Sequence, residues 1–198
     1  MSTKKIAVIL EAAGDAKRFG SNKLLHPMED GSPMIGKILS VIRTMDDSDC
    51  FYSKILVTQY YEVAELASDF AIVRNEHPEY GISHSMQLGI EAAGDPDAYM
   101  FCVCDQPGIQ ISTVERLIRA YEESGAGIVS LSWKGKMCNP KIFSAKYKEE
   151  LMSLSGDKGG RQIIKNHTDD LLLVEANNES EVIDIDINEN MESKRTTK

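Results

Sequence analysis

The stretch "ILEAAGDAKRFGSNKLL", from Ile9 to Leu25, decides how this chain begins to fold. An apolar run, Ile6–Leu10, leads into it, and a run of this length and composition predicts a buried β-strand. Two glycines follow, Gly14 and Gly20, so the predicted strand ends in a loop. Because glycines let backbone amides approach an anion closely, this loop is a candidate phosphate cradle.

The spacing within the loop excludes two common phosphate-binding motifs. A Walker loop has four residues between its glycines and a lysine directly after the second; here five intervene, and Lys23 lies three positions after Gly20. A dinucleotide fingerprint has a glycine two positions after the first, where this chain has Ala16. Arg18 and Lys23 supply a forked donor and a mobile charge, which suit a triphosphate. The alternative is an ordinary turn with solvated cations, and the loop alone does not decide between the two.

Length and charge limit the classes of function. The chain has 198 residues, of which 42% are hydrophobic, which is enough for one domain with its own core. Its net charge of -9 argues against nucleic acid held by a basic surface. No apolar run approaches the roughly 20 residues that span a bilayer, so we expect no membrane partner.

Cysteine usage bears on the compartment. The chain has no CxxC pair, and Cys102 and Cys104 fall within an apolar run. We therefore expect buried thiols in a reducing compartment, in place of a zinc site, and a cytoplasmic protein.

Predicted strands and helices alternate along the chain. Strands are expected at Ile6–Leu10, Lys54–Thr58, Ala71–Arg74, Ala98–Cys104, Gly127–Trp133, Leu171–Glu175 and Val182–Asp186. Helices are expected at Pro33–Thr44 with Ser32 as N-cap, Ile82–Ala93, Ser112–Glu123, Ala145–Leu154 and Gly159–His167. This alternation predicts a three-layer α/β/α fold with a mostly parallel, Rossmann-like central sheet. We expect one domain over residues 1–190 and a frayed tail over 191–198.

Three carboxylates are candidate metal ligands. Asp105 ends an apolar strand, where it could hold Mg²⁺ together with substrate phosphates or simply start a turn. Asp184 and Asp186 share one face of the strand predicted at Val182–Asp186, either completing a metal site or facing solvent. Since ligands bind beyond the carboxyl ends of the strands in open α/β sheets, these residues and the first loop are expected near one edge.

The segment "GISHSM" places Ser83 and Ser85 at a predicted helix start. Their hydroxyls and the free amides there could bind a base or a phosphate. Ordinary helix capping is the alternative interpretation. No Ser-His-Asp or Cys-His arrangement is visible, so covalent nucleophilic catalysis is not expected.

Six short motifs follow one another along the chain. They are "EAAG" continued by Arg18, Gly20 and Lys23, then "GISHSM", "CDQP", "CNPKIF", "SGDKGGR" and "DID". In this order they resemble the MobA-like nucleotidyltransferases of the molybdenum cofactor, in the cytidylyltransferase branch. The similarity extends from about Ile6 to Asn188.

The resemblance implies a fold of the nucleotide-diphospho-sugar transferase type and a reaction that joins CTP to the phosphate of molybdopterin. It implies Mg²⁺ as the cofactor, with Mn²⁺ as an alternative ion. The implied catalytic residues are Arg18, Lys23 and Asp105, and the implied metal ligands are Asp105 with Asp186 or Asp184. The implied nucleotide-binding residues are Ala12, Ala13, Gly14, Arg18, Gly20, Lys23, Ser83 and Ser85. The implied acceptor-binding residues are Asn139, Pro140, Ser155, Gly156, Asp157 and Arg161.

Departures from the family pattern keep other functions open. Glu11 replaces an apolar residue, Ala16 a serine, Cys104 a glycine, and Cys138-Asn139 a Gly-His pair. One alternative is a cytidylyl-, guanylyl- or sugar-phosphate nucleotidyltransferase with another acceptor. The other is a molybdenum-cofactor-binding chaperone with weak catalysis, whose partner would be a molybdenum hydroxylase apo-enzyme.

Overall fold

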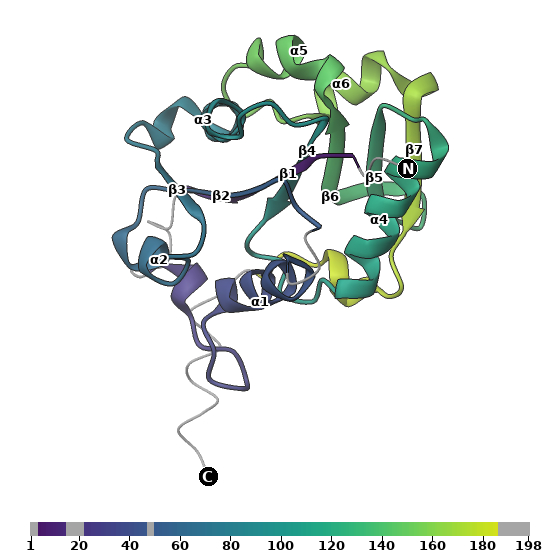
Figure 1. The fold of residues 1–198 in the computed structure, drawn as a ribbon. Coiled ribbons are helices and arrows are strands. Elements are labelled where there is room, and N and C mark those ends of the chain that lie inside the picture. The colour runs from purple at the N-terminus through teal and green to yellow at the C-terminus, as the bar shows by residue number, and fades with distance from the viewer. Residues whose placement is uncertain (1–3, 15–21, 47–49, 186–198) are drawn as a thin grey trace.

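The computed structural model describes residues 4–14, 22–46 and 50–185, which form a seven-stranded sheet between two layers of helices (Figure 1). The strands are β1 (Ile6–Ala12), β2 (Ser53–Thr58), β3 (Ala71–Arg74), β4 (Ala98–Val103), β5 (Ile128–Trp133), β6 (Lys136–Ser144) and β7 (Leu171–Glu175). Their order across the sheet is β3-β2-β1-β4-β6-β5-β7, and the neighbouring pairs are parallel except the two that include β6. β1 therefore lies between two parallel strands, and the carboxyl ends of β2, β1 and β4 meet at one edge.

Helices cover both faces of this sheet. They are α1 (Met34–Asp46), α2 (Tyr61–Glu65), α3 (Ile82–Ala92), α4 (Ile111–Ser124), α5 (Lys148–Met152) and α6 (Arg161–Asn166). Short 3₁₀ turns are η2 (Lys23–Leu25), η3 (Pro78–Tyr80), η4 (Ala145–Tyr147), η5 (Thr168–Asp170) and η6 (Glu179–Val182). Figure 1 shows α3, α5 and α6 on one face and α1 and α4 on the other. The predicted three-layer fold with a mostly parallel sheet is confirmed.

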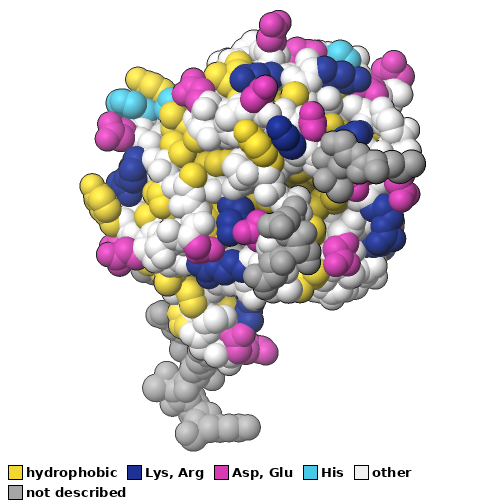
Figure 2. Space-filling model, in the orientation of Figure 1, with side chains coloured by type: hydrophobic (Ala, Val, Ile, Leu, Met, Phe, Trp, Pro, Cys, Tyr) yellow, Lys and Arg dark blue, Asp and Glu magenta, His cyan; other side chains and the backbone are white. Residues whose placement is uncertain are grey.

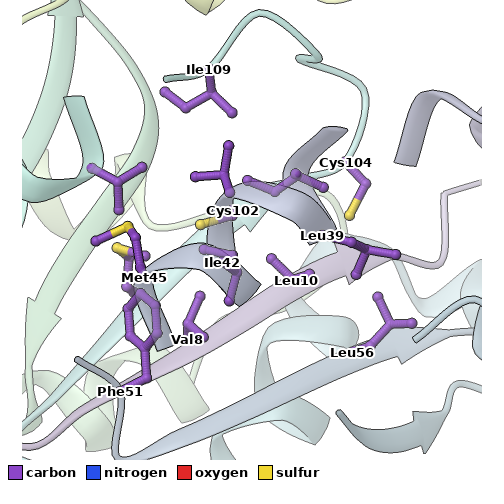
Figure 3. Close-up of a cluster of buried hydrophobic side chains, with 14 of the residues drawn as sticks. Val8, Leu10, Leu39, Ile42, Met45, Phe51, Leu56, Cys102, Cys104 and Ile109 are labelled. Atoms are coloured by element: carbon purple, nitrogen blue, oxygen red, sulfur yellow. The ribbon is translucent and has the colours of Figure 1, made fainter. Parts of the chain in front are cut away.

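Alternation along β1 divides the core into two clusters. Val8 and Leu10 point toward α1 and α4, where they pack with the buried thiol of Cys102 (Figure 3). Ala7 and Ile9 point to the opposite face and pack under α3, α5 and α6. Because successive side chains of a strand alternate between faces, each strand residue can be assigned to one layer.

The start of α1 differs from the expectation by one residue and in its cap. Ser32 is not the N-cap, because its backbone N–H and its hydroxyl both donate to the carboxylate of Asp30. Pro33 forms an isolated antiparallel bridge with Pro27, and the helix begins at Met34. The Asp30 side chain thus closes a local turn with Ser32, and this turn competes with capping of the helix by Ser32.

The strand β6 was missing from the sequence prediction. It follows β5 through a tight turn in which Lys134 has φ +51° and Gly135 has φ +76°, the left-handed pair favoured in two-residue hairpins. Pro140 lies inside β6, next to a register shift between Ser130 and Ser132 on β5, and proline inside a sheet is tolerated at such irregularities. The proline and the charged residues of β6 hid a strand that is paired on both sides.

The strand predicted at Val182–Asp186 is wrong over the residues that are described. Glu179–Val182 form the turn η6, and the chain up to Ile185 runs along the loop that follows β4. Gly108 makes this possible, because a Cβ there would lie 2.0 Å from the carbonyl oxygen of Ser180. The segment's hydrogen bonds therefore go to a loop, and the alternating acidic pattern does not mark a strand.

The four cysteines form no disulfide bond with one another. Cys102 and Cys104 are buried, and Cys50 and Cys138 are half-buried. Within residues 4–14, 22–46 and 50–185, no helix is long and apolar enough to cross a membrane.

Candidate active site

The loop after β1 is tied to the end of β2. Three consecutive backbone carbonyls accept hydrogen bonds from side chains that follow β2, at 2.9–3.0 Å: Ala12 from Thr58, Ala13 from Gln59 and Gly14 from Tyr60. These bonds turn the chain at the carboxyl edge of the sheet. Arg18 and Gly20, predicted to contact phosphates, lie outside the described residues.

Lys23 and Asp105 come together at this edge, as the sequence predicts. Asn22 caps η2 by accepting from the Leu24 amide at 3.0 Å, which presents Lys23 toward the sheet. Asp105 follows β4, and its carboxylate Oδ2 accepts from Lys23 Nζ at 2.7 Å. Residues 82 positions apart are thus joined by an ion pair at the tip of two neighbouring strands.

Around this ion pair lies a pocket of about 450 Å³, which we call the first pocket. Its walls come from the loop after β1, from η2, from the start of α3 and from the end of β4. The lining residues are Glu11, Ala12, Ala13, Gly14, Asn22, Lys23, Leu24, Pro78, Gly81, Ile82, Ser85, Val103, Cys104, Asp105 and Asp157. A cavity of this size suits a small-molecule ligand.

Of the two serines predicted to bind the nucleotide, Ser85 lines the first pocket and Ser83 does not. Ser85 lines the first pocket, and its Oγ accepts from Asn75 Nδ2 at 3.0 Å. Ser83 is buried, and its amide donates to the Gly156 carbonyl at 3.1 Å, so this amide of the helix start already has a partner. Gly81 lies against the same loop, with φ +84° and room for no side chain.

A divalent ion fits this edge through Asp105 more readily than through Asp184. The Asp105 carboxylate lines the first pocket, and Mg²⁺ commonly takes one or two protein carboxylates together with phosphate oxygens and water. Asp184 is exposed, and its Oδ1 accepts from Gln106 Nε2 at 2.8 Å. The Ile185 amide donates to the Asp105 carbonyl at 3.0 Å, so the chain approaches Asp105 just before Asp186, which lies outside the described residues. Within the described ranges, no three Asp, Glu, His or Cys side chains form a metal cluster.

A second pocket of about 260 Å³ adjoins the first and shares three lining residues with it, Glu11, Ile82 and Asp157. Its lining residues are Glu11, Ile82, Met86, Phe101, Asn139, Lys141, Phe143, Asp157, Gly159, Gly160 and Arg161. Of the six predicted acceptor-binding residues, the lining includes Asn139, Asp157 and Arg161. Pro140 is buried within β6 after a cis peptide bond, while Ser155 and Gly156 are exposed beside the pocket.

The second pocket holds two ionisable groups that sequence reasoning did not assign to the site: the buried Lys141 and the half-buried Glu11, whose Oε1 is buried. Burial raises the pKa of Glu11 from 4.5 to about 8, an effect that Lys141 opposes and Asp105 reinforces. Burial lowers the pKa of Lys141 from 10.5 to about 8, an effect that Glu11 opposes and Arg161 reinforces. The available signal for Lys141 was a single lysine between apolar residues in "NPKIF", which became meaningful only once β6 was recognised.

Charge elsewhere on the surface is mixed. On the face drawn in Figure 2, Lys and Arg side chains alternate with Asp and Glu side chains, and hydrophobic side chains lie between them.

Comparison with known proteins agrees with this geometry. The family model described as "MobA-like NTP transferase domain" matches residues 7–171. The chain belongs to this family. Its matched region includes both pockets up to Arg161, so the MobA-like domain is a nucleotidyltransferase domain by family and by fold. Comparison with curated proteins gave no match.

Solved structures share the fold of this MobA-like domain. Rv0371c from Mycobacterium tuberculosis H37Rv is 22% identical, with 98% of each chain covered and a TM-score of 0.77. Another structure of that protein is a complex with manganese, at 21% identity, 88% and 90% coverage and a TM-score of 0.67. A nucleotidyl transferase from Methanothermobacter is 24% identical over 91% of each chain, with a TM-score of 0.75. A CMP:2-keto-3-deoxy-manno-octonic acid synthetase complexed with CTP is 11% identical, covering 87% and 90%, with a TM-score of 0.68.

Proposed function

We propose that this protein transfers the cytidylyl group of CTP to the phosphate of molybdopterin and releases pyrophosphate. The observation that carries the proposal is the pair of adjoining pockets that share Glu11, Ile82 and Asp157. The first pocket has the volume for a nucleotide and carries the Lys23 cation in its lining, and the second has room for an acceptor. A group transfer needs two ligands whose reacting atoms meet at such a boundary.

In the proposed reaction, an oxygen of the acceptor phosphate forms a bond to the α-phosphorus of CTP. The bond from this phosphorus to the oxygen bridging to the β-phosphate breaks, and that oxygen leaves with pyrophosphate. The attacking phosphate is already ionised near neutral pH, so no proton has to be removed and no covalent enzyme intermediate forms.

The protein's part in this reaction is positioning and charge stabilisation. Lys23, with Arg18, neutralises the phosphates and stabilises the leaving pyrophosphate. Asp105, with Asp186 or Asp184, would hold Mg²⁺ or Mn²⁺. When bound, such an ion supplies Lewis-acid charge neutralisation at the α- and β-phosphates. Asn139 and Arg161, which both line the second pocket, would hold the acceptor.

Nucleotide choice is proposed to depend on Ala13. Ala12 and Ala13 both line the first pocket, but the Ala12 side chain packs into the core cluster with Val8 and Leu10, so the Ala13 side chain is the one proposed to meet the base. A methyl group in a close-fitting pocket disfavours the larger base by about 10- to 200-fold when it clashes. CTP is therefore expected to react ahead of GTP.

The test is pyrophosphate release from CTP, GTP, ATP and UTP with molybdopterin, with and without Mg²⁺. We expect release from CTP in the presence of the ion, and none from the Asp105→Asn variant. A sugar-phosphate panel with the same nucleotides covers the alternative of another acceptor. If the protein binds molybdopterin tightly but releases pyrophosphate from none of the nucleotides, the transferase proposal is wrong. The protein would then be a chaperone that delivers the cofactor to a molybdenum hydroxylase.

A further inference from the structure

Glu11 lies in the site, but the proposed reaction gives its side chain no role. It lies on β1, opposite Val57 of β2 and Val103 of β4, and its side chain lines both pockets. Its Oε1 is buried and has no hydrogen-bond partner. Since a buried polar atom without a partner is costly, a carboxylate here indicates that something outside the protein completes its hydrogen bonding.

Lys141 faces the same pocket from the neighbouring half of the sheet. It lies on β6 opposite Phe101 of β4 and is only 9% exposed. Its ammonium donates to Asn139 Oδ1, which leaves further N–H groups, because a lysine ammonium has three. Glu11 and Lys141 influence each other electrostatically, yet no hydrogen bond or ion pair joins these two described residues.

The rest of the second pocket is mostly apolar. Ile82 and Met86 of α3 form one side, and Phe101 and Phe143 of the sheet form another. Gly160 packs closely against Phe143, since a Cβ on Gly160 would lie 2.5 Å from its ring. Aromatic and aliphatic walls with a few placed polar groups suit a flat heterocycle.

We propose that Glu11 and Lys141 together bind the acceptor by the cyclic-amide edge of its ring, with Glu11 accepting from a ring N–H and Lys141 donating to the adjacent carbonyl oxygen. The inference rests on the proposed function, because it assumes that the second pocket is the acceptor pocket. It assigns the two residues a positioning role: they set where the ring lies and hence where its phosphate meets the nucleotide.

The opposed alternative is an ion pair that serves only the fold. A structural pair would be expected to satisfy its own hydrogen bonds, whereas here Glu11 Oε1 has no partner and the Lys141 hydrogen bond goes to Asn139. Both groups also line the pocket, which a purely internal pair would not.

Binding of a pterin that carries a phosphate monoester side chain tests the proposal directly, with the pterin's own fluorescence as the signal. We expect Glu11→Leu and Lys141→Met each to raise its Kd by about 10-fold or more, because each leaves a buried polar group of the ring without a hydrogen-bond partner. Glu11→Gln, which keeps one acceptor oxygen, should lose less than Glu11→Leu. CTP affinity should change less than pterin affinity in Lys141→Met, because Lys141 lines only the second pocket.

The double variant Glu11→Leu/Lys141→Met separates binding from folding. This variant replaces both side chains by apolar groups of similar size. If Glu11 and Lys141 served only the fold, the variant would bind the pterin with a Kd within about twofold of that of the unmodified protein. That result, or failure of the unmodified protein to bind the pterin, would overturn the inference. Variant-sensitive pterin binding without pyrophosphate release from any nucleotide would leave the inference standing and refute the transferase proposal.

Discussion

Replacing Gly81 by alanine should detach the loop that separates the two pockets. Gly81 has φ +84° and ψ -177°, a region occupied almost only by glycine, so alanine costs about 1–3 kcal/mol in backbone strain. Its Cβ would also lie 2.4 Å from the Gly156 carbonyl carbon and 2.8 Å from the Asp157 amide nitrogen. These are backbone atoms, so the loop has to move as a unit.

Moving the loop breaks the hydrogen bond from the Ser83 amide to Gly156, which contributes about 1 kcal/mol. Strain and lost hydrogen bond together give about 2–4 kcal/mol. For a chain of this length each kcal/mol lowers Tm by about 2–4 °C, so the expected fall is roughly 4–16 °C. Because this stretch supplies Asp157, Gly159, Gly160 and Arg161 to the second pocket but only Asp157 to the first, kcat/KM for the acceptor should fall more than CTP affinity.

Gly135→Ala is the matched control. Gly135 has φ +76° in the β5–β6 turn, but a Cβ there meets nothing within 4 Å. It therefore carries the left-handed strain, about 1–2 kcal/mol, without displacing the loop. Thermal unfolding and steady-state kinetics of both variants are the assay. Equal losses of Tm in the two variants, with unchanged acceptor kinetics in Gly81→Ala, would refute the reasoning.

Three further predictions concern single side chains of the first pocket. Asp105→Asn should lower kcat by about 100-fold or more while circular dichroism stays unchanged, and near-normal turnover at saturating Mg²⁺ would contradict its metal role. Ala13→Gly should raise the GTP/CTP ratio of kcat/KM by about 10-fold. Ala12→Gly, which removes a methyl group packed in the core, should change that ratio less. Burial raises the pKa of Glu11 from 4.5 to about 8, so the folded state keeps a proton that the unfolded chain releases, and stability falls as pH rises through this range. In Glu11→Gln, the free energy of unfolding measured by urea titration should fall less steeply with pH. An unchanged dependence on pH would show that Glu11 ionises normally.

Much of the architecture could be predicted because its signals are local. The apolar runs at Ile6–Leu10 and Ala98–Cys104 are buried except at Val103 and pair in parallel as β1 and β4, and placing their ends at one edge put Lys23 near Asp105. The sequence could not show that these two side chains pair, since no local pattern relates residues so far apart. For the same reason Glu11 was noted as a departure but could not be placed beside Lys141.

The missed elements share a physical cause. β6 contains a proline and charged residues, and what makes it a strand is pairing with β4 and β5, which sequence periodicity does not report. The acidic segment at Asp184 has the period of a strand but docks on a loop, because Gly108 lets the Ser180 carbonyl approach closely. In both places tertiary contacts override the local pattern.

The ion pair between Lys23 and Asp105 links nucleotide binding to metal binding. Their side chains are 22% and 25% exposed, and a pair so close to solvent contributes only about 0–1 kcal/mol. A triphosphate can therefore draw the Lys23 ammonium toward its own oxygens at small cost from this pair. Asp105 would then face the negatively charged phosphates without the Lys23 ammonium beside it. The repulsion between them is unfavourable until another cation lies between Asp105 and the phosphates. The nucleotide and the divalent ion should accordingly bind best together, with Lys23 moving from the carboxylate to the phosphate as Asp105 exchanges one cation for another.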